Sequence, residues 1–292
     1  MRFTFAESMC DPGHYAPLAQ AAERCGYTSF TVPDSICYPQ HSDSRYPYTD
    51  TGDRAFLEGK PFLEPFTLIP ALGAVTSRLR FTTFVVKLPI RQPVLVAKQA
   101  ASVAVLTNDR FGFGVGLSPW PEDFLATGTD WKTRGRRMDE MIEIIRGLTR
   151  PEGGFFEYHG EHYDVPSLKL CPLPTRPIPI LVGGHAEPAL RRAARLGDGW
   201  MHAGGGEAAD LDGALRRLAE LRHEYGRERE PFEIHVISLD AFTVDGVRRL
   251  EDKGVTDVIV GFRNPYERDT LSVQQKIAAL EAFAERVIAV VG

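Results

Sequence analysis

Apolar and polar positions recur along the chain with two different periods. Short apolar, often β-branched runs predict buried strands, and apolar residues that recur every three or four positions predict helices. Strands are expected over Arg2–Ala6, Thr28–Pro33, Leu79–Val86, Arg110–Gly116, Ile178–Val182, Gly199–Met201, Glu233–Ser238 and Val255–Gly261. Helices are expected over His14–Cys25, Leu63–Ser77, Val94–Leu106, Arg134–Leu148, Pro188–Leu196, Ala209–Tyr225, Asp245–Lys253 and Ser272–Val290.

Eight strands, each followed by a helix, are the number that closes a (β/α)8 TIM barrel. Runs such as Phe84-Val85-Val86 and Val258-Ile259-Val260 suit strands of a parallel sheet that is buried on both faces. A small hairpin insertion is expected near residues 155–165, with His159-Gly160 at its turn. No linker or repeat divides the chain, so residues 1–292 are predicted to form a single α/β barrel domain.

Charge and cysteine content narrow the class of protein. The formal net charge is -5 and the 34 lysines and arginines are scattered, so neither nucleic acid nor an anionic membrane is expected as a partner. The N-terminal segment lacks the apolar stretch of a signal peptide, which favours a cytoplasmic protein. The 4 cysteines form no C-x-x-C pair, so free thiols are expected.

The clearest candidate site is the turn after the fifth strand. The apolar run stops at Gly183 and Gly184, and a helix is expected to begin near Glu187-Pro188. Glycine lets a phosphate approach the backbone, and the first turn of a helix offers free N–H groups at the positive end of its dipole. The segment therefore predicts an anion-binding turn with His185 beside it. A plain strand-to-helix turn is the alternative.

Other candidates follow further strands and would meet at one mouth, because the C-terminal strand ends of such a barrel lie on one side. Asp34 follows the second strand, where a carboxylate can bind a cofactor hydroxyl or ring N–H. Glu7, Trp120 and His202 follow the first, fourth and sixth strands and are expected at a substrate pocket. Trp120 is equally compatible with a role that only anchors its loop.

Three glycines alternate along the fourth strand, at Gly112, Gly114 and Gly116. They do not match the G-x-G-x-x-G pattern of a dinucleotide-binding turn. Glycine on one face of a strand leaves room for tight packing or for a bound ring. Gly116, the nearest to the mouth, is therefore a candidate cofactor contact.

No metal site is expected. His159 and His162 straddle the hairpin turn but have no third ligand nearby. The first strand ends in Ala6-Glu7-Ser8, where metal-dependent barrel hydrolases have His-x-His.

Several longer stretches resemble one known family. They are Arg78-Leu79-Arg80 through Leu88-Pro89, Pro93 through Ser102, Arg110 through Gly116, Arg134 through Glu140, and Val182-Gly183-Gly184 through Gly197-Asp198-Gly199-Trp200. Together they make the chain similar to the bacterial luciferase-like monooxygenase superfamily. Within it, the chain resembles the single-component branch that uses the deazaflavin coenzyme F-420.

The resemblance implies a flavin or deazaflavin held at the C-terminal strand ends, with its phosphate on the Gly183-Gly184 turn. It also implies a bulge within Thr83-Phe84-Val85 that backs the ring and often contains a non-prolyl cis peptide. Relatives commonly have Asp-His after the second strand, whereas this chain reads Asp34-Ser35. His41 is then the nearest imidazole and the candidate proton donor, since imidazole titrates near working pH.

The resemblance thus implies an oxidoreductase that moves a hydride between bound coenzyme F-420 and a small organic substrate, with Asp34 and His41 as catalytic candidates. One alternative is an FMN-dependent two-component monooxygenase that receives reduced flavin from a partner reductase. Another is a non-catalytic flavin- or deazaflavin-binding protein, and a phosphate-binding isomerase would also explain the anion-binding turn. A homodimer is expected, because relatives are often dimers.

Overall fold

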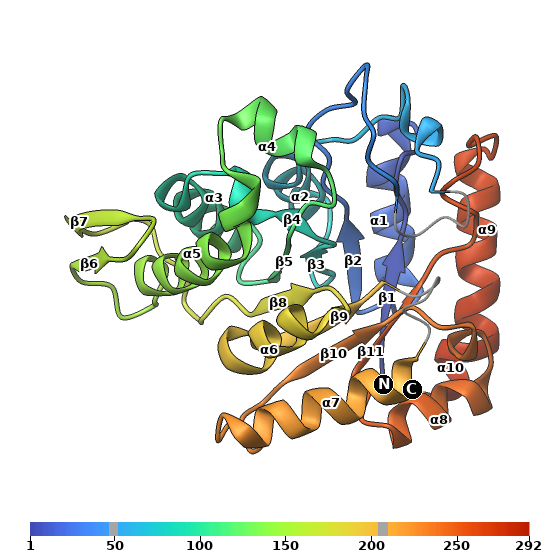
Figure 1. Ribbon diagram of the computed structural model, residues 1–292. Coiled ribbons are helices and arrows are strands. Elements are labelled where there is room, and N and C mark those ends of the chain that lie inside the picture. Colours follow the sequence, from blue (N-terminus) through green and yellow to red (C-terminus); the bar gives the residue numbers. More distant parts are fainter. Residues whose placement is uncertain (47–51, 204–209, 292) are drawn as a thin grey trace.

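A computed structural model of the protein describes residues 1–46, 52–203 and 210–291. Its main sheet is a closed parallel barrel ringed by helices, as the sequence predicts (Figure 1). The barrel strands are β1 (Arg2–Ala6), β2 (Ser29–Val32), β3 (Arg80–Thr83), β4 (Val86–Lys87), β5 (Phe111–Gly116), β8 (Ile180–Gly183), β9 (Gly199–His202), β10 (Glu233–Val236) and β11 (Asp257–Val260). Because β3 and β4 are parts of one strand, these segments fill eight barrel positions, and pairing between β3 and β5 closes the ring.

The helices follow the strands in chain order. They are α1 (Tyr15–Arg24), α2 (Pro65–Ala74), α3 (Pro93–Leu106), α4 (Pro121–Thr127), α5 (Arg134–Leu148), α6 (Glu187–Leu196), α7 (Leu211–Glu224), α8 (Val244–Asp252), α9 (Val273–Phe283) and α10 (Ala289–Val291). Helix α4 lies in a segment where no helix is predicted. A π-helical turn over Ala284–Ile288 interrupts the predicted last helix. The predicted start of one helix at Ala209 lies outside the described residues.

The predicted hairpin is present and is longer than expected. β6 (Phe156–His159) and β7 (Asp164–Leu168) pair antiparallel, so the second strand runs past Val165. Glu140 of α5 accepts hydrogen bonds from three successive backbone N–H groups in the turn, at Glu161, His162 and Tyr163. These bonds hold the hairpin against α5, at the side of the barrel (Figure 1).

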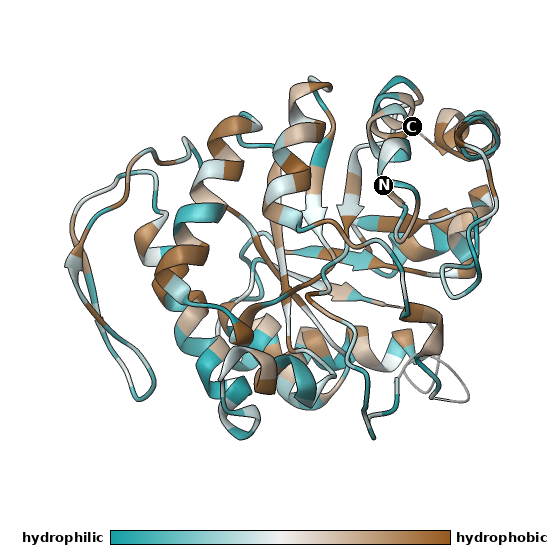
Figure 2. Ribbon diagram, turned by 90° about the horizontal axis from the view of Figure 1, so that it is seen from above, coloured by the Kyte–Doolittle hydropathy of each residue, from teal (hydrophilic) through white to brown (hydrophobic). Residues whose placement is uncertain are grey.

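Side chains alternate between the two faces of the barrel wall. In β1, Phe3 and Phe5 belong to a large apolar core between the sheet and the helices. A smaller apolar cluster fills the barrel interior near the C-terminal strand ends and consists of Leu181, Met201 and Ile259 packed with Ala6, Phe84, Val85 and Ile237. Figure 2 looks along a direction turned by 90° and shows hydrophobic and hydrophilic colours on different faces of the surrounding helices. The strands are thus covered by apolar side chains on both faces, which explains why their sequences are almost continuously apolar.

Among the helices described, none is both long and apolar enough to cross a membrane.

Candidate functional site

The third barrel strand is interrupted at the mouth. β3 ends at Thr83, β4 begins at Val86, and the peptide bond between Phe84 and Val85 is cis. The predicted irregularity within Thr83-Phe84-Val85 is therefore confirmed. Both Phe84 and Val85 pack on the interior apolar cluster, so the interruption faces the centre of the barrel.

Three glycines make room for this interruption. A Cβ atom on Gly114 would lie 1.8 Å from the Thr83 carbonyl oxygen. A Cβ atom on Gly116 would lie 2.7 Å from Val85 Cγ2, and one on Gly183 would lie 3.0 Å from Val85 Cγ1. Of the two interpretations of Gly116, the structure shows the tight packing directly, and a cofactor contact remains a prediction.

The interior positions at the mouth form a surface that we call the mouth floor. Ala6, Phe84, Val85 and Ile237 belong to the interior apolar cluster at this level. Gly116, Gly183 and Gly261 occupy matching interior positions on β5, β8 and just after β11, as the alternation along each strand requires. These positions carry small or apolar side chains. The mouth floor therefore suits a flat, largely apolar ring.

Lys87 is a charged residue at the edge of the mouth floor. It lies two positions after Val85 and on the same face, because the intervening Val86 belongs to the sheet–helix core. Its Nζ donates to Oδ2 of Asp123 at 2.7 Å, and their side chains are only 8% and 2% exposed. Ser118 Oγ donates to the same carboxylate oxygen. Neither member of this buried ion pair is among the site residues predicted from the sequence.

Asp34 lies beside Lys87, and both of its carboxylate oxygens are engaged. Arg91 binds Oδ1 and Oδ2 through its two terminal nitrogens, each at 2.8 Å. The backbone N–H of Lys87 donates to Oδ2 at 2.9 Å. Asp34 therefore holds the chain just after the interruption in place, and the structure supports a positioning role rather than that of a free carboxylate.

Two other predicted site residues have different surroundings from those expected. Glu7 is buried and pairs with Arg263 Nε at 2.6 Å and with Lys276 Nζ at 3.4 Å. Lys276 lies on α9, so this carboxylate ties the first loop to an outer helix. His41 is exposed in the loop after β2, where its side chain is accessible to solvent.

Trp120 belongs to an aromatic group that we call the ring cluster, which consists of Tyr46, Phe56, Trp120 and Tyr266. Trp120 stacks on Tyr46 with centroids 5.5 Å apart, and Tyr266 lies 4.9 Å from Phe56. These residues come from the loops after β2, β5 and β11. Trp120 is 6% exposed. It therefore anchors its own loop to the loop after β2, and Tyr46 and Phe56 join that loop to Tyr266 on the mouth side of the barrel.

The turn after β8 has the predicted geometry. Gly184 has φ of 122°, a conformation that favours glycine. Helix α6 begins at Glu187, and its N-cap residue Ala186 offers no side-chain oxygen to the first turn. Anions bind well at such a helix start. The turn thus fits the predicted anion site, although no described contact tests it.

The two histidines near this turn lie together. The ring centroids of His185 and His202 are 4.6 Å apart. His185 Nε2 accepts a hydrogen bond from the Ala203 N–H. Burial, and then the charge of His202, lower the pKa of His185 to about 4. His202 shares the helix-facing side of β9 with Trp200, which belongs to the sheet–helix core. Its orientation therefore differs from the expected one, which faces the mouth.

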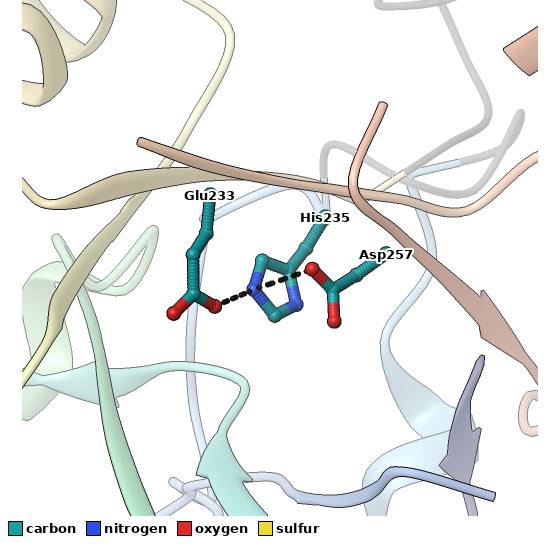
Figure 3. A group of neighbouring side chains, drawn as sticks. All are labelled: Glu233, His235 and Asp257. Carbon is teal, nitrogen blue, oxygen red and sulfur yellow. Dashed lines mark hydrogen bonds and ion pairs between the residues drawn. The ribbon is translucent and has the colours of Figure 1, made fainter. Parts of the chain in front are cut away.

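A second polar group, the basal ion cluster, fills the opposite end of the barrel interior and consists of Arg2, Arg80, Glu233, His235 and Asp257. Figure 3 shows the imidazole of His235 between two carboxylates, with Nε2 2.7 Å from Glu233 Oε2 and 3.5 Å from Asp257 Oδ2. Such a trio has a geometry that could hold a metal ion.

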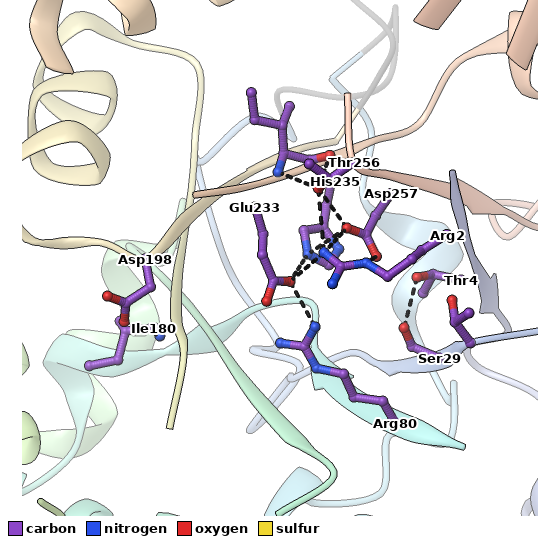
Figure 4. A network of polar contacts seen from close by, with 12 residues as sticks. Arg2, Thr4, Ser29, Arg80, Ile180, Asp198, Glu233, His235, Thr256 and Asp257 are labelled. Carbon is purple, nitrogen blue, oxygen red and sulfur yellow. Dashed lines mark hydrogen bonds and ion pairs between the residues drawn. The ribbon is translucent and has the colours of Figure 1, made fainter. Parts of the chain in front are cut away.

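Two arginines already bind these carboxylates, as Figure 4 shows. Arg2 Nη2 lies 2.6 Å from Asp257 Oδ2, and Arg80 Nη1 lies 2.7 Å from Glu233 Oε2. They supply the positive charge that a cation would supply. The basal ion cluster is therefore a structural network, and it is separated from the mouth by the interior apolar cluster.

Comparisons with known proteins agree with this geometry. The profile of the luciferase-like monooxygenase family matches residues 7–250. The uncharacterized protein Rv0940c of Mycobacterium tuberculosis is 63% identical over 291 residues, 99% of each chain. An F420-dependent glucose-6-phosphate dehydrogenase of Tsukamurella paurometabola is 26% identical over 244 residues, 75% of this chain and 67% of that one. The structure of monooxygenase RslO1 from Streptomyces bottropensis has a TM-score of 0.77 at 16% identity, with 100% of both chains covered.

Proposed function

We propose, from the premise that the chain belongs to the luciferase-like monooxygenase family, that it is an oxidoreductase that binds coenzyme F-420 at the mouth of the barrel. In this proposal the bound deazaflavin exchanges a hydride with a small organic substrate. The observation that carries it is the mouth floor, with its interrupted strand and the glycines that accommodate Val85. Such a floor matches the flat face of a tricyclic ring.

The residues present fit the ring and the phosphate of this cofactor. The mouth floor would support the ring, and the Gly184 turn with the start of α6 would receive its phosphate. Asp34 and Arg91 keep the interrupted strand in one conformation, so the supporting surface is formed before the ligand arrives. The ring cluster draws three loops together over the mouth and helps to exclude water.

When bound, the deazaflavin would supply the hydride chemistry. The contribution of the protein is then to orient the reactants and to keep them close, which can account for much of a rate enhancement. Few ionisable residues are needed for such a reaction. This agrees with a mouth floor that is largely apolar.

The second candidate is an FMN-dependent monooxygenase of the same fold that is supplied by a flavin reductase. The match to monooxygenase RslO1 over the whole chain favours it. The resemblance to an F420-dependent dehydrogenase over three quarters of the chain favours a deazaflavin. We place F-420 first because the chain resembles the single-component branch of the family and because a relative similar over 75% of this chain is F420-dependent.

Fluorescence titration of the purified protein with F-420 and with FMN tests this proposal. We expect F-420 to bind at least tenfold more tightly than FMN, a difference of about 1.4 kcal/mol. We also expect that candidate carbonyl substrates oxidise the reduced protein-bound deazaflavin in the absence of oxygen. Tight FMN binding with strictly oxygen-dependent turnover would favour the monooxygenase instead. Binding of neither cofactor would refute both.

A further inference from the structure

The mouth floor has one charged residue at its edge among the residues described. Its other described members are alanine, glycine, valine, isoleucine and phenylalanine side chains. Lys87 shares their face and is almost inaccessible to solvent. A buried ammonium is costly unless its hydrogen bonds are made. The position of Lys87 in an otherwise apolar surface therefore needs an explanation.

The hydrogen bonds of Lys87 leave donor capacity unused. A lysine ammonium carries three N–H donors. In the described part of the chain, Nζ has one hydrogen-bond partner, Oδ2 of Asp123. Two donors therefore remain for a ligand, on a side chain that solvent barely reaches.

Asp123 fixes the direction of this ammonium. It lies in the first turn of α4 and is itself buried. Ser118 Oγ donates to its Oδ2, and Cys37 Sγ lies 3.7 Å from its Oδ1. Because these neighbours hold the carboxylate, the Lys87 ammonium that binds it is held in one position at the edge of the mouth floor. Asp123 is thus a positioning residue for Lys87.

We propose that Lys87 donates hydrogen bonds to an oxygen edge of the bound ring on which negative charge gathers when the ring is reduced, so that the site binds the reduced form more tightly than the oxidised form, whose charge is absent (FMN) or spread over the ring (F-420). This inference rests on the proposed function. A charge-assisted hydrogen bond is stronger than a neutral one, and the low local dielectric at the mouth floor increases the difference. The oxidised ring has less charge on that edge, so it gains less from the same ammonium.

The test compares affinities for the two redox forms of FMN and of F-420, measured anaerobically with the full-length protein. In Lys87→Met we expect the preference for the reduced form to fall at least tenfold relative to the natural protein. For a two-electron couple this equals a decrease of about 30 mV in the midpoint potential of the bound cofactor. Lys87→Arg keeps the charge and should restore the preference to within about threefold.

Two further variants keep the test decisive. Lys132→Met removes an exposed lysine elsewhere and should leave both affinities unchanged. If Lys87→Met alone is unstable, because Asp123 loses its partner, Lys87→Met/Asp123→Asn removes both charges and provides the same measurement. Circular dichroism checks that each variant is folded.

The outcomes separate this inference from the proposed function. An unchanged redox preference in the folded Lys87 variants would overturn the role of Lys87, even if the cofactor binds well. Equal losses of affinity for both redox forms would also overturn it, because they indicate a general packing defect. Failure of the natural protein to bind either cofactor would instead refute the proposed function.

Discussion

Replacement of Asp257 by asparagine should destabilise the fold through the basal ion cluster. Asp257 is completely buried and accepts hydrogen bonds from Arg2 Nε at 2.9 Å and Nη2 at 2.6 Å. Asparagine keeps the shape but removes the charge, and its amide group directs N–H donors toward those of the arginine. The perturbation therefore breaks the pair without leaving a large cavity.

The expected cost follows from the exposure of the partner. Removal of one member of a fully buried ion pair costs about 3–5 kcal/mol. The Arg2 side chain is 41% exposed, so it can regain water, and Glu233 Oε2 still lies 3.2 Å away. We therefore expect a loss of about 2–3 kcal/mol in the free energy of unfolding, below the fully buried case. Urea unfolding measures this loss from the transition midpoint.

Matched variants define the result that would refute this reasoning. Asp245→Asn changes a carboxylate whose side chain is 82% exposed, and it should have no measurable effect. Arg2→Met combined with Asp257→Asn should lose less stability than the sum of the two single variants, because both remove the same pair. A loss below about 1 kcal/mol for Asp257→Asn, or strict additivity, would show that the cluster is not coupled as the distances suggest.

Three further predictions follow from individual contacts. Gly114→Ala should prevent stable folding or lower the melting temperature strongly, because its Cβ would lie 1.8 Å from the Thr83 carbonyl oxygen. Gly135→Ala, whose Cβ would lie 3.2 Å from a side-chain atom of Arg192 and near no backbone atom outside its own helix, should lower it far less. The pKa of His185 is lowered to about 4, so the unfolded chain binds a proton at this residue before the folded protein does as pH falls. The stability that neutral His185 contributes is therefore present above about pH 6.5 and is lost toward pH 4. The difference in melting temperature between the natural protein and His185→Gln should shrink in that window. Burial alone would raise the pKa of Glu233, but the hydrogen bond with His235 and the charge of Arg80 lower it. The ionised carboxylate therefore stabilises the fold, and this contribution should be lost as pH falls below the ordinary glutamate range. In the same melting series, the melting temperature of Glu233→Gln should fall less in acid than that of the natural protein.

The barrel could be predicted from local pattern because each strand is buried on two faces. In a half-exposed sheet, a segment such as Val258-Ile259-Val260 would leave apolar side chains in water, so it indicates a strand buried on both faces. The helices between such strands have apolar faces that can cover them. The interruption at Phe84 and Val85 was different. Nothing in the apolar pattern of that strand marks it, and its prediction rests on the resemblance alone.

Local signals for α4 were present, although no helix was predicted there. Pro121 occupies the first turn, and Glu122 and Asp123 follow it, which is a typical helix start. The helix has seven residues, too short for a clear periodicity. Tertiary contacts stabilise it instead, among them the ion pair from Lys87 to Asp123.

The charged clusters could be predicted only in part. Glu233 and His235 are two residues apart in one predicted strand, so their side chains share a face. The sequence alone reveals this. Their partners Arg2, Arg80 and Asp257 lie on other strands, and the register that joins them depends on closure of the whole barrel. The same holds for Lys87 and Asp123, which lie on β4 and α4. The outward orientation of His202 follows from its separation by two residues from Trp200.

The ring cluster makes three loops interdependent. The ring cluster joins residues from three separate parts of the sequence, and each ring packs against at least one other ring of the cluster. The loop after β2 is the shared partner, because Tyr46 contacts both Trp120 and Tyr266. A substitution at Tyr46 removes a packing surface from the other two loops, so neither of them can be exchanged between relatives independently of the loop after β2. Laboratory evolution of a new substrate preference should therefore require paired changes, with a smaller ring at one of these positions compensated by a larger one at another.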